Sequence, residues 1–192
     1  MNKKTVALTD KQYVEIIKII MSGFVCKDGH VVKPNNRIAT ALVLEGNLGI
    51  RISDILKLSL QSIVHDGNRY RLDIVEKKTG KKREFTVPLE IYAYMQKYAI
   101  DNNIGPAARL FPISERAVQK HLKLACDYLG LINVSTHSFR KYFGTNIYEE
   151  NGHDINLVRV LYQHSSVVTT QIYIGVSPDQ IENALQKHVK LL

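Results

Sequence analysis

The spacing of apolar residues in the first quarter of the chain predicts two helices. Apolar side chains recur at helical spacing after Thr9-Asp10, a candidate N-cap, and the pattern stops at Ser22-Gly23. A second helix is predicted from Pro34 to Leu48, and Gly49 ends it. Two consecutive helices at the start already favour a largely helical fold.

A third, short helix is expected directly after Gly49. It would carry Ile55, Leu56 and Leu58, and either Ser53 or Asp54 could cap it. This pattern predicts that Arg51 lies at the junction between two helices.

Alternation replaces the helical pattern between Leu60 and Pro88. Apolar positions alternate with charged ones there, which is typical of a small antiparallel sheet. The turn Lys78-Thr79-Gly80-Lys81 is predicted to join two strands, because glycine supplies the positive φ that a tight hairpin needs. The tip of this hairpin is strongly basic.

Helical spacing returns from Leu89 to the end of the chain. Four further helices are predicted: one from Leu89 through Tyr98, one from the cap Ser114 to Gly130, one from His137 to Tyr148 with Ser135 or Thr136 as cap, and one from Ile155 to Tyr162. A last amphipathic segment is expected at Asp179–Leu192. No repeat or linker-like stretch interrupts the pattern, so the sequence predicts a single domain over residues 1–192, mostly α-helical with a small antiparallel sheet, of the α+β class.

Composition narrows the class of protein. The 192 residues are 45% hydrophobic and 23% charged, which is ordinary for a soluble globular domain. Cys26 and Cys126 show no paired spacing, which argues against a disulfide framework or a cysteine-based zinc site. Without an apolar run of about 18 residues or an apolar amino terminus, neither a membrane role nor export is expected. A cytoplasmic location is therefore predicted.

A formal net charge of +8 points to a nucleic acid as partner, and two arginines could bind its phosphates. A phosphodiester gains negative charge in the pentavalent transition state, so bidentate cationic donors would stabilise it. Arg140 lies three residues after His137, near a predicted helix N-terminus that also favours an anion, and Arg51 could contact the phosphate from the opposite side. For a lone arginine, a surface ion pair would be the better interpretation.

Tyr173 is a candidate nucleophile in the stretch that begins at Leu161. Its phenol, with a pKa of about 10 in a model peptide, needs a base, and His164 or His137 could accept its proton. A buried tyrosine with a satisfied hydroxyl is the alternative interpretation. Lys78, on the hairpin tip, could protonate the leaving oxygen. Alternatively, the basic residues there form only a solvated turn that binds backbone phosphates: Lys77, Lys78, Lys81, Lys82 and Arg83.

In chain order these residues resemble the catalytic set of the tyrosine recombinases, the phage integrase family: Arg51, Lys78, His137, Arg140, His164 and Tyr173. Gly49-Ile-Arg51 is similar to the family's first-arginine motif, with Asp54 at the position of the acidic partner. Lys78-Thr-Gly resembles the hairpin lysine motif, and His137-Ser-Phe-Arg140 resembles the His-x-x-Arg box. The resemblance covers about residues 9–188 and implies the catalytic-domain fold of this family, with a three-stranded antiparallel sheet.

The resemblance also implies a mechanism of DNA integration or excision. Tyr173 would attack a DNA strand to give a 3′-phosphotyrosine and a free 5′-hydroxyl, while Arg51 and Arg140 hold the phosphate and Lys78 acts as general acid. His137 and His164 would assist proton transfer. No metal or other cofactor is implied. The implied partners are double-stranded DNA and accessory DNA-bending proteins. The chain would be a monomer free in solution and a tetramer on paired DNA sites. The resemblance also implies an origin in a bacterium, phage or mobile element.

Two features depart from the family pattern. Gln163 precedes His164, where the family usually has glycine, and we expect no part of this sequence to form the N-terminal core-binding domain of full-length members. Weak, steeply salt-dependent binding to duplex DNA is therefore expected. The alternatives are a type IB topoisomerase-like enzyme, which would relax supercoils without recombinants, a non-catalytic DNA-binding protein, or a globular domain whose charge only keeps it soluble.

Overall fold

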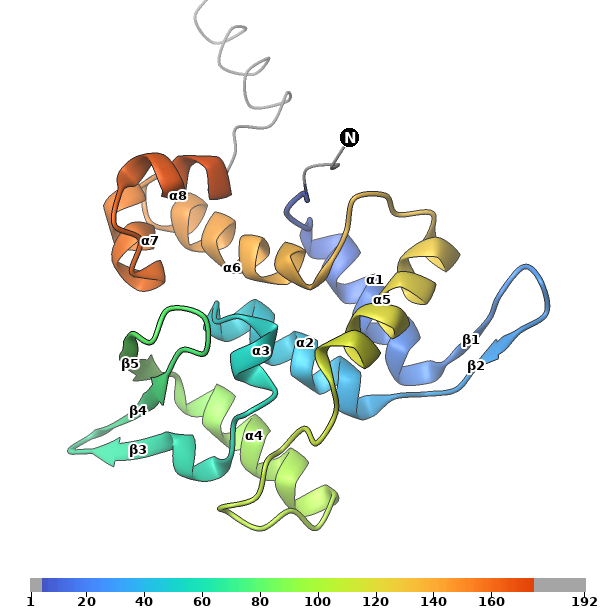
Figure 1. The fold of residues 1–192 in the computed structure, drawn as a ribbon, viewed down its shortest axis with the longest axis horizontal. Helices are drawn as coiled ribbons and strands as arrows, with labels where there is room; N and C mark the ends of the chain where they lie inside the picture. The colour runs from blue at the N-terminus through green and yellow to red at the C-terminus, as the bar shows by residue number, and fades with distance from the viewer. Residues whose placement is uncertain (1–4, 175–192) are drawn as a thin grey trace, which may run out of the picture.

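The computed structural model describes residues 5–174, apart from the side chains of Ile172 and Tyr173. The segment Asp179–Leu192, predicted as an amphipathic helix, lies outside the described residues. Helices dominate the described chain and accompany one three-stranded antiparallel sheet and one two-stranded hairpin (Figure 1). The predicted α+β class is confirmed. None of the described helices is both long and apolar enough to cross a lipid bilayer.

Helix α2 (Asn36–Leu48) lies at the centre of the fold. It is buried on nearly all sides, because α1 (Asp10–Ser22), α4 (Leu89–Asp101) and α6 (Thr136–Glu150) pack around it. The helix has no basic residue in its last turn and ends at Gly49, whose φ of 60° is left-handed. Both predicted amino-terminal helices are thus confirmed, with Thr9 and Asn35 as their capping residues.

Helix α3 (Ile52–Ile55) follows directly, and its capping differs from the prediction. Arg51 is its N-cap residue and makes no side-chain capping bond; neither Ser53 nor Asp54 caps the helix, since both lie within it. The first free amide, that of Ile52, instead donates to Glu45 Oε1 at 3.0 Å. Glu45 comes from the preceding helix, so the cap is a tertiary contact that local sequence rules could not reveal.

The predicted sheet is confirmed. Strands β3 (Ile63–Asp66), β4 (Arg69–Val75) and β5 (Lys82–Val87) pair antiparallel in that order, after the 3-10 turn η1 (Leu60–Ser62). Val75 pairs with Lys82, so residues 76–81 form the connection, here called the β4–β5 tip. Gly80 has the expected positive φ of 65°.

The carboxyl-terminal half consists of helices. The predicted helices appear as α5 (Glu115–Leu129), capped by Ser114, α6, preceded by Ser135, and α7 (Ile155–Tyr162), capped by Asp154. A further helix, α8 (Val167–Ile174), packs on α6 and α7 and was not predicted. Its eight residues include several β-branched ones, which have low helix propensity, so its tertiary contacts decide its conformation.

A small hairpin between α1 and α2 was also not predicted. Strands β1 (Phe24–Val25) and β2 (Val31–Val32) pair antiparallel and project from the body of the molecule (Figure 1). Each strand has only two residues, too few to produce a recognisable alternation in the sequence.

We expect Gly49→Ala to destabilise the protein more than Gly67→Ala. Both glycines have a φ near 60°, but a Cβ at Gly49 would collide with the ring of Phe143, whereas nothing lies within 4 Å of one at Gly67. Both substitutions should therefore introduce similar backbone strain. The collision at position 49 should lower the free energy of unfolding by an additional ~1–3 kcal/mol. Denaturant unfolding of both variants measures the difference, and equal losses would contradict this packing.

Candidate active site

Arg51 projects from the α2–α3 junction toward the β4–β5 tip, where it pairs with Glu76. Its Nη1 lies 2.7 Å from Glu76 Oε2. The same carboxylate oxygen accepts a hydrogen bond of 2.7 Å from the hydroxyl of Thr79. Burial acts to raise the pKa of Glu76, but the hydrogen bonds from Thr79 and Arg51 outweigh it and lower that pKa. Glu76 is thus an ionised partner of Arg51.

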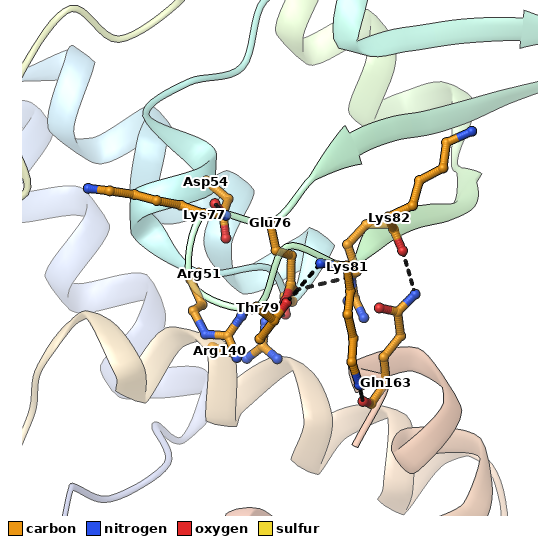
Figure 2. A network of polar contacts seen from close by, with 11 residues as sticks. Arg51, Asp54, Glu76, Lys77, Thr79, Lys81, Lys82, Arg140 and Gln163 are labelled. Atoms are coloured by element: carbon orange, nitrogen blue, oxygen red, sulfur yellow. Dashed lines mark hydrogen bonds and ion pairs between the residues drawn. The ribbon is translucent and has the colours of Figure 1, made fainter. Parts of the chain in front are cut away.

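Asp54, which stands at the position of the family's acidic partner, makes a different contact. Its Oδ1 accepts a hydrogen bond of 2.8 Å from the backbone N–H of Lys77, and its side chain is buried. Asp54 therefore holds the β4–β5 tip by the backbone, while the ion pair of Arg51 is made with Glu76 (Figure 2).

Arg140 lies on α6 and is 1% exposed. Its Nη1 donates to the carbonyl oxygen of Gly49 at 2.6 Å, and its guanidinium lies over the ring of Tyr162, 4.4 Å from the centroid. The hydroxyl of Tyr162 in turn donates to the backbone carbonyl of Arg140. The turn that begins α3 and the end of α7 thus fix the second arginine from two sides.

The position of Arg83 differs from the one that the sequence predicted. The sequence suggested that it belongs to an exposed basic turn, yet it is 1% exposed and its Nε lies 3.5 Å from Glu76 Oε1. It faces inward because β5 alternates, so that Arg83 is buried while its neighbours Lys82 and Glu84 are exposed. Burial, together with the charges of Arg140 and Arg51, lowers the pKa of Arg83 to about 10.

Both predicted histidines lie in the field of these arginines. Burial lowers the pKa of His164 to about 4, with added repulsion from Arg140 and Arg51. Burial and the same two arginines also lower the pKa of His137. His164 Nδ1 lies 3.1 Å from the hydroxyl oxygen of Thr170, a buried residue of α8. Both imidazoles are therefore neutral at physiological pH and can accept a proton or a hydrogen bond.

An open groove joins three of the predicted residues. It has a volume of about 430 Å³, and Arg51, Lys78 and His137 all line it. The other residues that line it come mostly from α3, α5 and the hairpin: Ile52, Ser53, Lys77, Glu115, Gln119 and Thr136. The tertiary structure thus brings together residues that are 86 positions apart in the sequence (51 to 137).

The remaining basic residues of the hairpin contact the end of α7 and the start of α5. Lys81 Nζ donates to the carbonyl oxygen of Gln163 at 3.2 Å, and Gln163 Nε2 donates to the carbonyl oxygen of Lys82 at 2.8 Å (Figure 2). Lys77 Nζ lies 3.4 Å from Glu115 on α5. Lys77, Lys81 and Lys82 are exposed, as expected.

Tyr173 lies in α8, but its side chain is outside the described part of the chain. The helix begins just after His164 and packs against α6, which carries His137 and Arg140. The backbone of the candidate nucleophile therefore belongs to an element that packs beside the arginine cluster.

Sequence reasoning missed Glu76 and Tyr162 as members of this region, and it noted Gln163 only as a departure from the family pattern, without its contact. A single acidic residue next to a run of lysines is the only local signal for Glu76. The contacts of Gln163 and Tyr162 join elements distant in sequence, so no local signal existed for them.

Comparison with known proteins identifies the family. The model of the phage integrase family matches residues 7–180. The chain belongs to this family. The probable integrase/recombinase YoeC of Bacillus subtilis is 31% identical over 155 residues, which cover 78% of this chain and 83% of that protein. The tyrosine recombinase XerC of Bradyrhizobium diazoefficiens is 30% identical, over 76% of this chain and 47% of its own length.

Solved structures share the fold. The catalytic domain of bacteriophage HP1 integrase superposes with a TM-score of 0.64 at 16% identity, and the match covers 96% of each chain. A XerH site-specific recombinase bound to a palindromic difH substrate gives a TM-score of 0.70 at 18% identity, over 96% of this chain and 54% of that one. The expected fold of a tyrosine recombinase catalytic domain is confirmed.

We expect His164 to make the integrase fold of this chain less stable as the pH falls from about 6.5 to about 4. The ordinary pKa of histidine is 6.5 and that of folded His164 is about 4, so the unfolded chain binds a proton in this window that the folded chain does not. His137, with its lowered pKa, acts in the same direction.

Melting temperatures measured across this window test the assignment. His164→Gln should flatten the decline, because the unfolded chain then loses one proton-binding group. The exposed His30→Gln is the matched control and should keep the slope of the wild type. An unchanged slope in His164→Gln would show that His164 titrates normally in the folded protein.

Proposed function

We propose that the chain is the catalytic domain of a site-specific recombinase that cleaves and rejoins DNA through a covalent 3′-phosphotyrosine at Tyr173. The observation that carries this proposal is the convergence of Arg51 and Arg140, from separate helices, beside a groove lined by Lys78 and His137. Family membership supports the same reaction.

Arg51 and Arg140 are proposed to bind the scissile phosphate. Their guanidinium groups are held in place before any ligand arrives, so little reorganisation is needed when charge develops on the non-bridging oxygens. Arg51 is the more accessible of the two, at 20% side-chain exposure. Arg83 is buried and would not contact the phosphate, but its positive charge would strengthen the electrostatic field there.

The proton transfers are assigned to neutral histidines and a lysine. The Tyr173 oxygen would attack phosphorus, its proton passing to His164 or His137, and the bond from phosphorus to the 5′ oxygen would break. Lys78 would give a proton to that leaving oxygen. The low pKa of His164 keeps its imidazole unprotonated when the tyrosine attacks, and it also makes this imidazole a weaker base than an ordinary histidine. The energy of the broken ester is kept in the phosphotyrosine, so the proposed reaction requires no cofactor.

The wider assembly is also a proposal. The chain spans 83% of YoeC but only about half of the XerC relative and of the XerH structure. We propose that a core-binding domain closes around double-stranded DNA opposite this domain, and that protomers are monomeric free and tetrameric on paired sites. Lys77, Lys81 and Lys82 would contact the DNA backbone, and Asp54 and Glu76 would support the hairpin. The reaction would take place in the cytoplasm, where DNA-bending proteins would assist it.

The topoisomerase-like alternative is not favoured, because the named relatives are integrases and recombinases. A non-catalytic DNA-binding role is not favoured either. It would leave unexplained why two arginines are fixed by buried contacts beside the groove.

A nicked suicide substrate tests the reaction directly. We expect the wild-type chain to become trapped on DNA through Tyr173, and Tyr173→Phe to give no covalent adduct because it lacks the attacking oxygen. Arg140→Ala should lower the rate of adduct formation by about 100-fold or more, as does the loss of other transition-state donors.

Arg69→Ala is the matched control, since Arg69 is an exposed arginine paired with Asp66 at the far end of the sheet. Adduct formation by Tyr173→Phe at the wild-type rate would exclude the proposed nucleophile. Denaturing gels with labelled DNA measure both results.

A further inference from the structure

The β4–β5 tip, which carries Lys78, is held from two sides (Figure 2). On one side, Glu76 contacts Arg51 and Thr79, and Asp54 accepts the backbone N–H of Lys77. On the other side, Lys81 and Lys82 exchange hydrogen bonds with Gln163. The tip therefore has fixed contacts both with the turn that bears Arg51 and with the turn that bears His164.

Glu76 is suited to hold the tip because its carboxylate is buried and charged. It is 3% exposed, accepts hydrogen bonds of 2.7 Å from both Arg51 and Thr79, and forms an ion pair with Arg83 at 3.5 Å. Arg51 and Arg83 lie outside the tip, and Thr79 lies within it. Charge-assisted hydrogen bonds in a buried site are stronger than neutral ones, so this contact should dominate the docking.

Gln163 makes the second contact from a strained backbone conformation. Its φ is 52°, in the left-handed region, at the C-cap of α7. A glycine would adopt this conformation without strain, and the family usually has glycine before the last histidine. The glutamine side chain provides what glycine cannot, a hydrogen bond of 2.8 Å to the carbonyl oxygen of Lys82.

We propose that Glu76 and Gln163 are positioning residues that dock the β4–β5 tip before DNA binds, so that Lys78 is already placed in the groove that Arg51 and His137 also line. The inference rests on the proposed function for the role of Lys78, but the docking itself does not. A docked tip lowers the entropy cost of bringing the general acid to the leaving oxygen.

Hydrogen–deuterium exchange on the DNA-free protein tests the docking. We expect the peptide that covers residues 76–82 to exchange about fivefold faster in Gln163→Gly, which loses one neutral hydrogen bond, and at least about tenfold faster in Glu76→Ala. The amides of Glu76 and Gly80, which donate within the tip, report the change.

Two further variants keep the test decisive. Glu76→Gln preserves side-chain volume if Glu76→Ala does not fold, and it should still increase exchange because the charge is lost. Glu84→Gln is the matched control, since Glu84 lies on β5 and pairs with the exposed Lys82 and with Arg71. Wild-type exchange rates in both Gln163→Gly and Glu76→Gln would overturn the proposal.

A substrate with a sulfur leaving group tests what the docking does for catalysis. If sulfur replaces the bridging 5′ oxygen, the phosphorus–sulfur bond breaks and the thiolate leaves without a proton, since a thiol has a pKa of only about 8.5. A variant that misplaces Lys78 should therefore be slow on the oxygen substrate and normal on the sulfur substrate.

We expect Gln163→Gly to cleave the oxygen substrate about tenfold more slowly and the sulfur substrate within about twofold of the wild type. Glu76→Gln should be only partly rescued by sulfur, because Glu76 also contacts Arg51. Equal slowing on both substrates by Gln163→Gly would refute a role through Lys78. If the wild type cleaves neither substrate, the proposed function fails, and the exchange rates still decide the docking.

Discussion

The structure depends on burying positive charge around one carboxylate. Arg83 and Arg140 are each 1% exposed, Arg51 is partly exposed, and Glu76 lies between Arg51 and Arg83. Taking guanidinium groups out of water is costly unless each finds hydrogen-bonding partners, and like charges in a medium of low polarity repel one another. The lowered pKa of Arg83 reflects both effects. Such a cluster gains stability when an anion such as a phosphate arrives.

The same cluster sets the properties of its neighbours. Two histidines close to it are held neutral, because burial and then repulsion from the arginines lower the pKa of each. Glu76 stays ionised despite its burial, while Glu45, also buried, has its pKa raised well above the ordinary value by desolvation. In the proposed reaction, this one set of arginines would hold the phosphate and keep both imidazoles unprotonated when the phenol attacks.

The fold supplies the rigidity that this arrangement needs. Helix α2 is buried on nearly all sides, so the turn at its end has a fixed position, and that turn places both Arg51 and the carbonyl that Arg140 contacts. Glu45 of α2 satisfies the first free amide of α3, which fixes the direction of the chain after Arg51. The sheet then presents its hairpin tip to the same turn.

The sequence by itself determined the helices with clear periodicity, the three-stranded sheet, and the residues of the family motifs. These follow from local rules, such as the capping by Thr9 and Ser114 and the alternation along β4. Only the tertiary structure decided which partner each charge meets. In the folded chain, Arg51 forms its ion pair with Glu76 and not with Asp54, and Arg83 is buried. Gln163 forms a hydrogen bond with Lys82, 81 positions away in the sequence. Pairing between distant elements depends on how helices pack, and neither propensity nor spacing along the chain contains that information.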